Sequence, residues 1–421
     1  MKKEISIVEL FSGIGSQAKA LNKISAKRGY TPNVKNTCEW DVHAIVAYDY
    51  IHNGFNINEE VKDLKKEVLL QYLKKYSLSN DGKVPINPKT LERYSTEVLR
   101  RIYSSILNTN NLISVKDVKG KDLPNNLSIL TYSFPCQDLS NVGALHGYNK
   151  GIDRNANTRS GLLWEVERIL IERRNEKLDL PKFLILENVT ALEATRHSDN
   201  FNQWKDSLIN LGYINKVFKL YSPDFGIPQN RKRLLMLSVY VGEDDSLKKR
   251  IENYFEEKDL NNKDYIKSLN LQKRELREFL KIDYENNQYY QEALLSQPNR
   301  TNSRIEMWEN NSKIVDENNN IKKIVQTITT KQDRHPNSGN IYFNANNDKS
   351  NYRFLTPREC FLLMGFDERD YEILVENNFS SRSNSLFFSR DKLYKLAGNS
   401  IVVNMLEAVF DQIIDIVEIL N

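Results

Sequence analysis

The chain has 421 residues, 40% of them hydrophobic, which is enough for a substantial core and, at roughly 150 residues per domain, for two or three domains. It carries 60 basic and 56 acidic residues, and this mild positive surplus permits a nucleic-acid partner without requiring one. No run approaches the roughly 18 apolar residues of a membrane span and the N-terminus lacks a secretory signal, so we expect a cytoplasmic protein.

The chain opens with a predicted strand at residues 5–10, followed by a glycine turn and a helix, which is typical of a doubly wound α/β domain. Gly13 and Gly15 lack a Cβ, so the backbone can approach a ligand closely. Glu39 follows at about the spacing at which an acid binds ribose hydroxyls, and Trp40 can stack on adenine. The pattern indicates an adenosine-type ligand and leaves NAD and S-adenosylmethionine open; a plain tight turn is the alternative.

Residues 61–107 interrupt the alternation of strands and helices. Apolar side chains recur at helical spacing on both sides of a breaker stretch at 79–85, which predicts an inserted helical hairpin. Its outer faces are basic, and we interpret them as a solvated surface, with phosphate contact as the alternative.

A predicted strand at residues 129–132 leads to Cys136. The three cysteines are dispersed and the five histidines show no ligand spacing, so we expect neither a disulfide framework nor a metal site. A lone cysteine is more often part of a core. Its place after a strand, beside Pro135 and a polar Gln-Asp pair, instead favours a nucleophile at the edge of a sheet where ligands bind.

Two further strands, at residues 183–186 and 234–237, flank other polar groups. Glu187 ends the first strand, where a carboxyl can donate a proton across the sheet edge; a helix cap is the alternative. Alternation along a strand predicts that Gln229, Arg231 and Arg233 share one face. Such donors suit carbonyl, carboxylate or phosphate groups, with a basic edge strand as the alternative.

The composition of the sequence changes between about residues 240 and 350, where charged and Asn-rich stretches dominate. We predict a catalytic and cofactor-binding domain at 1–238, a smaller second domain at 239–387, and a C-terminal segment at 388–421 that returns to the first. An amphipathic helix is expected to start at Gly398.

Taken in order, these segments resemble the bacterial DNA (cytosine-5) methyltransferase family over almost the whole chain except 61–107 and 240–350. The matching motifs are Phe11-x-Gly13-x-Gly15, Glu39-Trp40, Asp117-Val118, Phe134-Pro135-Cys136-Gln137, Gly161–Glu165, Glu187-Asn188-Val189, Gln229-x-Arg231-x-Arg233, Leu355–Glu359 and Gly398-Asn399-Ser400. Ser16-Gln17 departs from the family, where Gly-Gly or Gly-Leu often follows the turn.

The resemblance implies a doubly wound, mostly parallel α/β sheet, a Rossmann-like methyltransferase domain, with a target-recognition domain at 239–387. Cys136 would attack C6 of a flipped-out cytosine in double-stranded DNA. Glu187 would stabilise ring atom N3, Arg233 would bind the ring carbonyl, and Arg231 would orient phosphate or Glu187. The residues implied for S-adenosylmethionine are Phe11, Gly13, Ile14, Gly15, Glu39, Trp40, Asp117, Val118, Pro135, Leu162, Asn399 and Ser400.

The resemblance also implies a monomer that modifies DNA within a restriction-modification system, beside a restriction endonuclease for the same site. Three alternatives stay open: a related enzyme acting on RNA, a nicotinamide-dependent oxidoreductase that uses the Gly13–Glu39 region, and a non-catalytic DNA-binding regulator. A role as an oxidoreductase would leave Cys136 and Arg233 unexplained. A regulator would have no need of catalytic residues, yet every catalytic position of the family's motifs is occupied.

Overall fold

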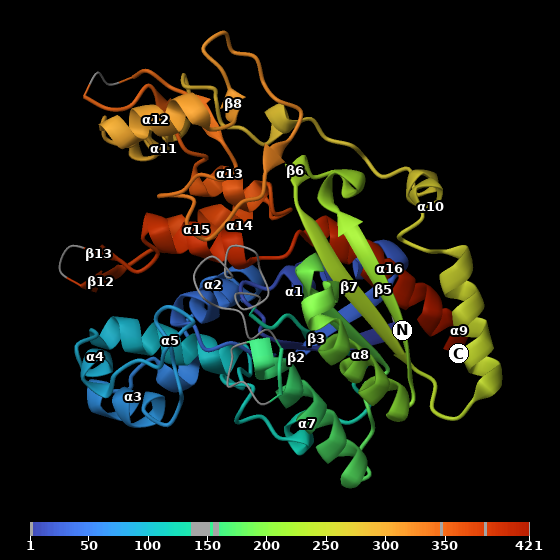
Figure 1. Cartoon of the computed structure of the whole chain (residues 1–421). Helices are drawn as coiled ribbons and strands as arrows, with labels where there is room; N and C mark the ends of the chain where they lie inside the picture. Colours follow the sequence, from blue (N-terminus) through green and yellow to red (C-terminus); the bar gives the residue numbers. More distant parts are fainter. Residues whose placement is uncertain (1–2, 136–151, 155–159, 346–347, 383–384, 421) are drawn as a thin grey trace. The chain divides into compact units, whose positions relative to one another are not determined.

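The computed structural model describes residues 3–135, 152–154, 160–345, 348–382 and 385–420 (Figure 1). The chain forms two compact units, each built from segments that are distant in sequence. Unit 1 contains residues 1–220, 232–270 and 406–421, and unit 2 contains residues 221–231 and 271–405. In the described part of the chain, no helix combines the length and apolar character needed to cross a membrane.

A six-stranded sheet in the order β2-β1-β3-β4-β7-β5 lies at the centre of unit 1. Its strands are β1 (Lys3–Leu10), β2 (Tyr30–Cys38), β3 (Ile129–Tyr132), β4 (Phe183–Asn188), β5 (Tyr213–Tyr221) and β7 (Lys232–Tyr240). The helices associated with this unit are α1 (Ser16–Arg28), α2 (Val42–Asn53), α3 (Lys66–Leu73), α4 (Pro88–Glu92), α5 (Thr96–Asn108), α7 (Leu163–Asn175), α8 (Thr195–Asn210), α9 (Asp245–Glu257), α10 (Lys263–Ser268) and α16 (Val403–Leu420). The pairs β1–β2, β1–β3 and β3–β4 are parallel, whereas β7 is antiparallel to β4. The prediction of an α/β fold with a mostly parallel sheet is confirmed.

The strand order reverses between β1 and β3, because the chain passes from β1 to β2 and later returns to the other side of β1. Open α/β sheets bind ligands outside the carboxyl ends of their strands at such a switch point. The register aligns one residue of each parallel strand in a single row: Cys38, Leu10, Tyr132 and Leu186. The residues that come next along these strands therefore share one edge: Glu39, Phe11, Ser133 and Glu187.

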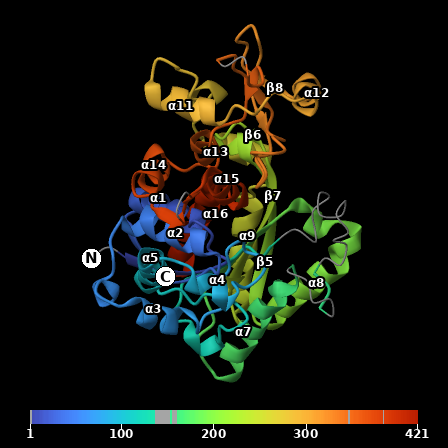
Figure 2. The same ribbon diagram turned by 90° about the vertical axis from the view of Figure 1, so that its left-hand side faces the viewer.

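Both faces of the sheet are buried at its central strands β1, β3, β4 and β7, and the sequences of these strands reflect this. Val8 and Leu130 belong to a cluster with the inner side chains of α7 and α8. Their neighbours Ile7 and Ile129 point to the opposite face and are also fully buried. Each such side chain contributes roughly 1.5–3 kcal/mol by leaving water. Figure 2 shows α7 and α8 in a view turned by 90° from that of Figure 1.

The predicted helical insertion at 61–107 is present, but it contains three helices, α3, α4 and α5, instead of a hairpin of two. The additional helix α4 forms because Asn87 accepts a hydrogen bond from the Lys89 N–H and Pro88 occupies the first helical turn. Helix α5 is amphipathic, begins at the Ser95 cap, and packs against α2 and α3.

Unit 2 contains short strands and helices. Its strands are β6 (Gln229–Asn230), β8 (Lys313–Val315), β9 (Val325–Gln326), β10 (Asn340–Tyr342), β11 (Tyr352–Arg353), β12 (Ser380–Arg382) and β13 (Ser385–Leu386). Its helices are α11 (Asn287–Leu295), α12 (Asn302–Asn310), α13 (Pro357–Leu362), α14 (Glu368–Glu376) and α15 (Arg390–Asn399). Strands β11, β10 and β8 form one sheet, and β6 pairs with β9.

The borders of the compact units differ from the predicted domain borders at 238/239 and 387/388. Residues 239–270 pack with unit 1, where Lys258 forms an ion pair with Asp415 at 2.8 Å and Asp259 one with Lys216 at 2.7 Å. Residues 388–405 pack with unit 2. The assignment of a target-recognition role to the second domain stays a prediction.

The predicted C-terminal helix starts later than expected, at Val403 instead of Gly398. Gly398 lies inside α15, and a Cβ on it would come within 2.5 Å of the backbone of Thr329 and Thr330, so this close approach requires glycine. Ser400 is extended and ends α15, which separates the two helices.

Candidate active site

The loop after β1 contains the first group of predicted site residues. Phe11 has a φ of 59°, and the Gly13 N–H donates a hydrogen bond of 3.1 Å to Glu39 Oε2. A Cβ on Gly15 would lie 2.1 Å from His52 Nε2, and its φ of +80° is left-handed, so α1 can start here only with glycine. The loop therefore approaches both α2 and the end of β2.

His52 of α2 fixes the middle of this loop. Its Nε2 lies 3.0 Å from the carbonyl oxygen of Ile14. Burial lowers the pKa of His52 to about 4, so the ring is neutral near pH 7, and the carbonyl can only accept. Nε2 therefore carries the proton and donates to Ile14, whose side chain is buried.

The Glu39 carboxylate lies at the end of β2 and faces the glycine loop. Its Oε1 accepts hydrogen bonds of 2.8 Å from the N–H groups of Trp40 and Asp41, while Oε2 accepts from Gly13. Burial and the nearby Asp41 carboxylate raise the pKa of Glu39 to about 7. Three backbone donors thus orient a carboxylate that has about four acceptor positions, which leaves room for a ligand hydroxyl.

Apolar residues predicted to contact the cofactor lie on one cluster at this edge. Val118 belongs to the buried cluster of Leu10 and Tyr132, and the half-buried Phe11 and Leu162 pack against the same cluster. Asp117 is exposed, next to the buried Val118. Phe11 follows β1 and Leu162 follows β3 along the chain, and the structure brings both against the cluster that contains Val118.

Glu187 is the centre of a second group, at the ends of β3 and β4. Only 7% of its surface is exposed. The Ser133 hydroxyl donates a hydrogen bond of 2.6 Å to Oε2, and Arg233 Nε of β7 lies 3.0 Å from Oε1. A hydroxyl and a guanidinium on opposite oxygens hold the carboxyl group in one orientation.

The backbone that leads to Cys136 is held by side chains from neighbouring elements. Asn188 Nδ2 donates 3.1 Å to the Phe134 carbonyl, and the Ser160 hydroxyl donates 2.7 Å to the Pro135 carbonyl. Cys136 itself lies outside the described residues, so its predicted role as nucleophile is not tested. The described chain reaches the residue before it, at the same edge as Glu187.

The prediction that Gln229, Arg231 and Arg233 share one strand face is wrong. The strand breaks at Arg231, between β6 and β7, and the chain passes from unit 2 to unit 1 at this point. Arg231 is buried in unit 2 and donates to the carbonyl groups of Ile328 and Ser400, at 3.1 and 2.7 Å. Arg231 was expected to orient phosphate or Glu187. In the structure, Arg233 forms the ion pair with Glu187.

The predicted cofactor residues Asn399 and Ser400 lie at the end of α15, in unit 2. The Ser400 hydroxyl donates to the Leu396 carbonyl at 2.8 Å. Their predicted contact with a cofactor stays a prediction. Gln229, the first residue of the Gln229-x-Arg231-x-Arg233 motif, also lies in unit 2. Its side-chain amide donates 2.8 Å to the Leu363 carbonyl, so it has a structural role there.

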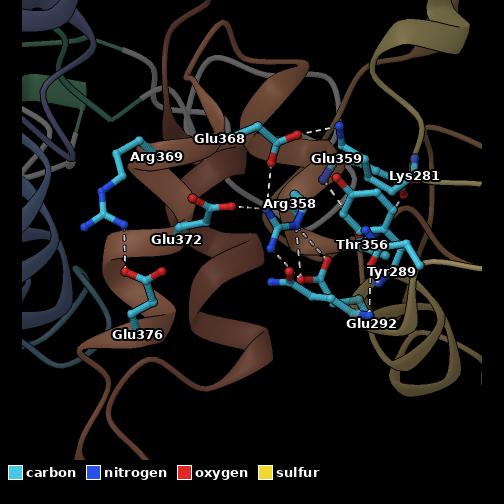
Figure 3. Close-up of polar contacts among 12 residues, drawn as sticks. Lys281, Tyr289, Glu292, Thr356, Arg358, Glu359, Glu368, Arg369, Glu372 and Glu376 are labelled. Carbon is cyan, nitrogen blue, oxygen red and sulfur yellow. Dashed lines mark hydrogen bonds and ion pairs between the residues drawn. The ribbon is translucent and has the colours of Figure 1, made fainter. Parts of the chain in front are cut away.

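A charged cluster organises the Leu355–Glu359 motif in unit 2 (Figure 3). Arg358 of α13 is almost fully buried and forms ion pairs with Glu292 of α11 and with Glu368 and Glu372 of α14, at 2.9, 2.6 and 3.2 Å. The adjacent Glu359 is paired with the fully buried Arg353 at 2.8 Å. One arginine therefore links three helices through the forked donors of its guanidinium.

Sequence reasoning assigned no site role to Ser133, Asn188, Ser160 or Asn111. Ser133 had a usable signal, because it follows a buried strand directly before Cys136. Asn111 had none, since its contact with Glu39 joins residues 72 positions apart. Among the described residues, no group of three or more His, Cys, Asp or Glu side chains is arranged to hold a metal ion.

A family model for the C-5 cytosine-specific DNA methylase matches residues 91–415. The chain is 34% identical to the orphan methyltransferase M.SssI of Spiroplasma monobiae, over 98% of this chain and 97% of that protein. It is 28% identical to the type II methyltransferase M2.ScrFI of Lactococcus lactis subsp. cremoris, over 97% of this chain and 99% of that one.

Solved structures show the same fold at low sequence identity. The S. pombe Dnmt2 methyltransferase is 17% identical, with a TM-score of 0.57, and the match covers 98% of this chain and 99% of that one. The Entamoeba histolytica methyltransferase EhMeth is 14% identical, with a TM-score of 0.54, over 99% of each chain.

Proposed function

Because the chain belongs to the C-5 cytosine-specific DNA methylase family, we propose that it transfers a methyl group from S-adenosylmethionine to C5 of a flipped-out cytosine in double-stranded DNA. The chain is a DNA (cytosine-5-)-methyltransferase. The donor, the flipped base and the covalent step belong to the proposal. The observation that carries it is Glu187, held by Ser133 and Arg233 at the sheet edge that leads to Cys136.

The groups at the switch point fit S-adenosylmethionine. The oriented Glu39 carboxylate can accept from ribose hydroxyls, and the exposed Asp117 carboxylate can accept from the adenine amino group. Trp40 and Phe11 are half-buried and offer apolar surface to the adenosine. When bound, S-adenosylmethionine supplies the electrophilic methyl group. Gly13, Ile14, Gly15, Val118, Pro135 and Leu162 are proposed to shape the remaining wall.

Our proposed chemistry begins with the Cys136 thiolate, which forms a bond to C6 of cytosine. Electron density would then move through the ring, so that C5 becomes nucleophilic and bonds to the methyl group while the bond between that methyl group and the sulfonium sulfur breaks, the sulfur keeping the electron pair. Glu187 holds a proton at N3 and thereby stabilises the charge on the ring. Loss of the C5 proton to a base and release of the Cys136 sulfur restore the aromatic ring.

Arg233 has two roles in this proposal. Its Nε orients Glu187, and one terminal nitrogen donates 2.8 Å to the Lys232 carbonyl. We assign its other terminal nitrogen to the carbonyl oxygen of the cytosine. Extracting the base from the duplex costs a few kcal/mol, which contacts of this kind must recover.

Unit 2 is proposed to recognise the DNA sequence, with basic side chains on phosphates and a few side chains on base edges. Arg231, Asn399 and Ser400 would then act where this unit meets the substrate or cofactor. We propose that the enzyme works as a monomer, which sedimentation with and without a DNA duplex would test.

The test is bisulfite sequencing of DNA from cells that express the chain, with Cys136→Ser as the inactive variant. The expected result is cytosine protection at one recurring sequence, which the variant abolishes while purified variant still binds S-adenosylmethionine. Cys360→Ala is the control, because Cys360 is fully buried in α13 of unit 2. Protection that survives Cys136→Ser would refute the nucleophile, and absence of protection by the native chain would refute the reaction.

We also propose that the enzyme is the modification half of a restriction-modification system. The type II name of the Lactococcus relative supports this, and the orphan name of the Spiroplasma relative supports an unpaired enzyme. A neighbouring gene whose product cuts the protected sequence only when it is unmethylated would establish the pair.

A further inference from the structure

Both main-chain groups of Glu39 are bound by one side chain. Asn111 Oδ1 accepts a hydrogen bond of 3.1 Å from the Glu39 N–H, and Asn111 Nδ2 donates 3.1 Å to the Glu39 carbonyl. This amide therefore replaces a neighbouring strand at the end of β2. Asn111 is buried, at 8% exposure, so water competes little for these bonds.

The backbone of Asn111 is anchored in the helical segment that interrupts the α/β alternation. Its N–H donates 2.9 Å to the Ile106 carbonyl at the end of α5, and beside it the Leu112 N–H donates 2.8 Å to the Thr37 carbonyl of β2. Asn111 Oδ1 also accepts 2.8 Å from the Ile113 N–H. Ile113 has a φ of 64°, a costly conformation for a β-branched residue, and Asn111 stabilises it.

The residues after Glu39 are bound by the same segment from another position. The Ser79 N–H donates 2.7 Å to the Trp40 carbonyl, and the Ser79 carbonyl accepts 2.9 Å from the Val42 N–H. Ser79 is fully buried, and its hydroxyl donates 2.6 Å to the Val84 carbonyl. The segment at 59–111 thus holds the Glu39–Val42 backbone through Ser79 and Asn111.

We propose that Asn111 is a positioning residue for the methyl donor, and that the helical segment 59–111 serves to place the Glu39 carboxylate at the ribose. This inference rests on the proposed use of S-adenosylmethionine. Asn111 acts through Glu39: it fixes the main chain, and the carboxylate, already bonded to Gly13, follows. The segment therefore has a role in cofactor affinity that does not depend on its basic outer faces.

The test measures S-adenosylhomocysteine binding by calorimetry and the kinetics of methyl transfer for Asn111→Ala. The variant loses three side-chain bonds, and loss of the two to Glu39 predicts about ten-fold weaker binding and a similar rise in KM for S-adenosylmethionine. The kcat at saturating donor and the KM for DNA should change by less than about two-fold, since Asn111 touches neither reacting group. The control is Asn36→Ala, which removes a bond of 3.1 Å from β2 to the Asn110 carbonyl.

A double-variant cycle separates positioning from general destabilisation. In a Glu39→Ala background, Asn111→Ala should weaken S-adenosylhomocysteine binding by less than about two-fold, because the carboxylate that it places is gone. An unchanged ten-fold effect in that background, or equal behaviour of Asn111→Ala and Asn36→Ala, would overturn the inference. If Asn111→Ala fails to fold, Asn111→Asp keeps both acceptor bonds and should weaken binding about three-fold; native affinity in that variant would also overturn it. A native chain that binds no S-adenosylmethionine would instead refute the proposed function.

Discussion

Arg233→Ala removes the guanidinium from a carboxylate that is almost fully buried. The side chains of Arg233 and Glu187 are 15% and 8% exposed, and Nε lies 3.0 Å from Oε1. Ser133 continues to donate to Oε2, so the carboxyl group keeps one of its two partners. The variant therefore isolates the contribution of the cation.

The expected loss follows from these contacts. A hydrogen bond to a charged group contributes about 1.5–3 kcal/mol, and removing one partner of a fully buried pair costs about 3–5 kcal/mol. Because Ser133 remains and Arg233 is slightly exposed, we expect about 3 kcal/mol in the free energy of unfolding. Methyl transfer should fall about 100-fold, since Glu187 loses its fixed orientation.

Urea unfolding followed by circular dichroism measures the loss, and a second variant tests its cause. Arg233→Ala combined with Glu187→Gln should recover about 1–2 kcal/mol, because no uncompensated charge stays buried. Arg174→Ala is the control: this exposed arginine of unit 1 bonds a carbonyl at 3.4 Å, and its loss should cost less than about 0.5 kcal/mol. Equal urea midpoints for Arg233→Ala and Arg174→Ala would refute the reasoning.

Three further predictions concern other buried groups. Burial raises the pKa of Glu9 from 4.5 to about 7, so the folded state keeps a proton that the unfolded state loses, and the free energy of unfolding should fall as pH rises from about 4.5 to 7. Glu9→Gln should remove up to about 3 kcal/mol of that fall, measured by urea unfolding at pH 5 and pH 8. Gly15→Ala should lower the melting temperature and abolish S-adenosylmethionine binding, because its Cβ would overlap His52; native binding would contradict the contact. Arg358→Lys keeps the charge but loses the forked contacts that link three helices, and should lower the free energy of unfolding of unit 2 by about 2–4 kcal/mol. Limited proteolysis should then cleave unit 2 faster; an unchanged rate of cleavage would count against a linking role.

Much of unit 1 could be predicted because its strands are buried on both faces and read as continuous apolar runs, as at residues 129–132 and 183–186. Glu39 could be found from its spacing after the glycine turn, and Glu187 because it follows the apolar run at 183–186. Arg231 was expected on the same strand face as Arg233 because alternation assumes an unbroken strand, whereas the chain changes units between them. The compact units differ from the predicted border near residue 239, because a charged sequence does not reveal that Asp259 pairs back to Lys216.

The segmented construction of unit 1 affects the order in which it can form during synthesis. Arg28 of α1 pairs with Asp411 and Asp415 of α16, at 2.8 and 2.6 Å, so the first helix completes its packing with residues near the other end of the sequence. The first segment of unit 1 ends at residue 220 and its last segment begins at residue 406, about 185 residues later. A ribosome needs roughly 10–40 s to translate that many residues. A chain that ends before α16 therefore lacks both carboxylate partners of Arg28, and its first helix stays without this part of its packing.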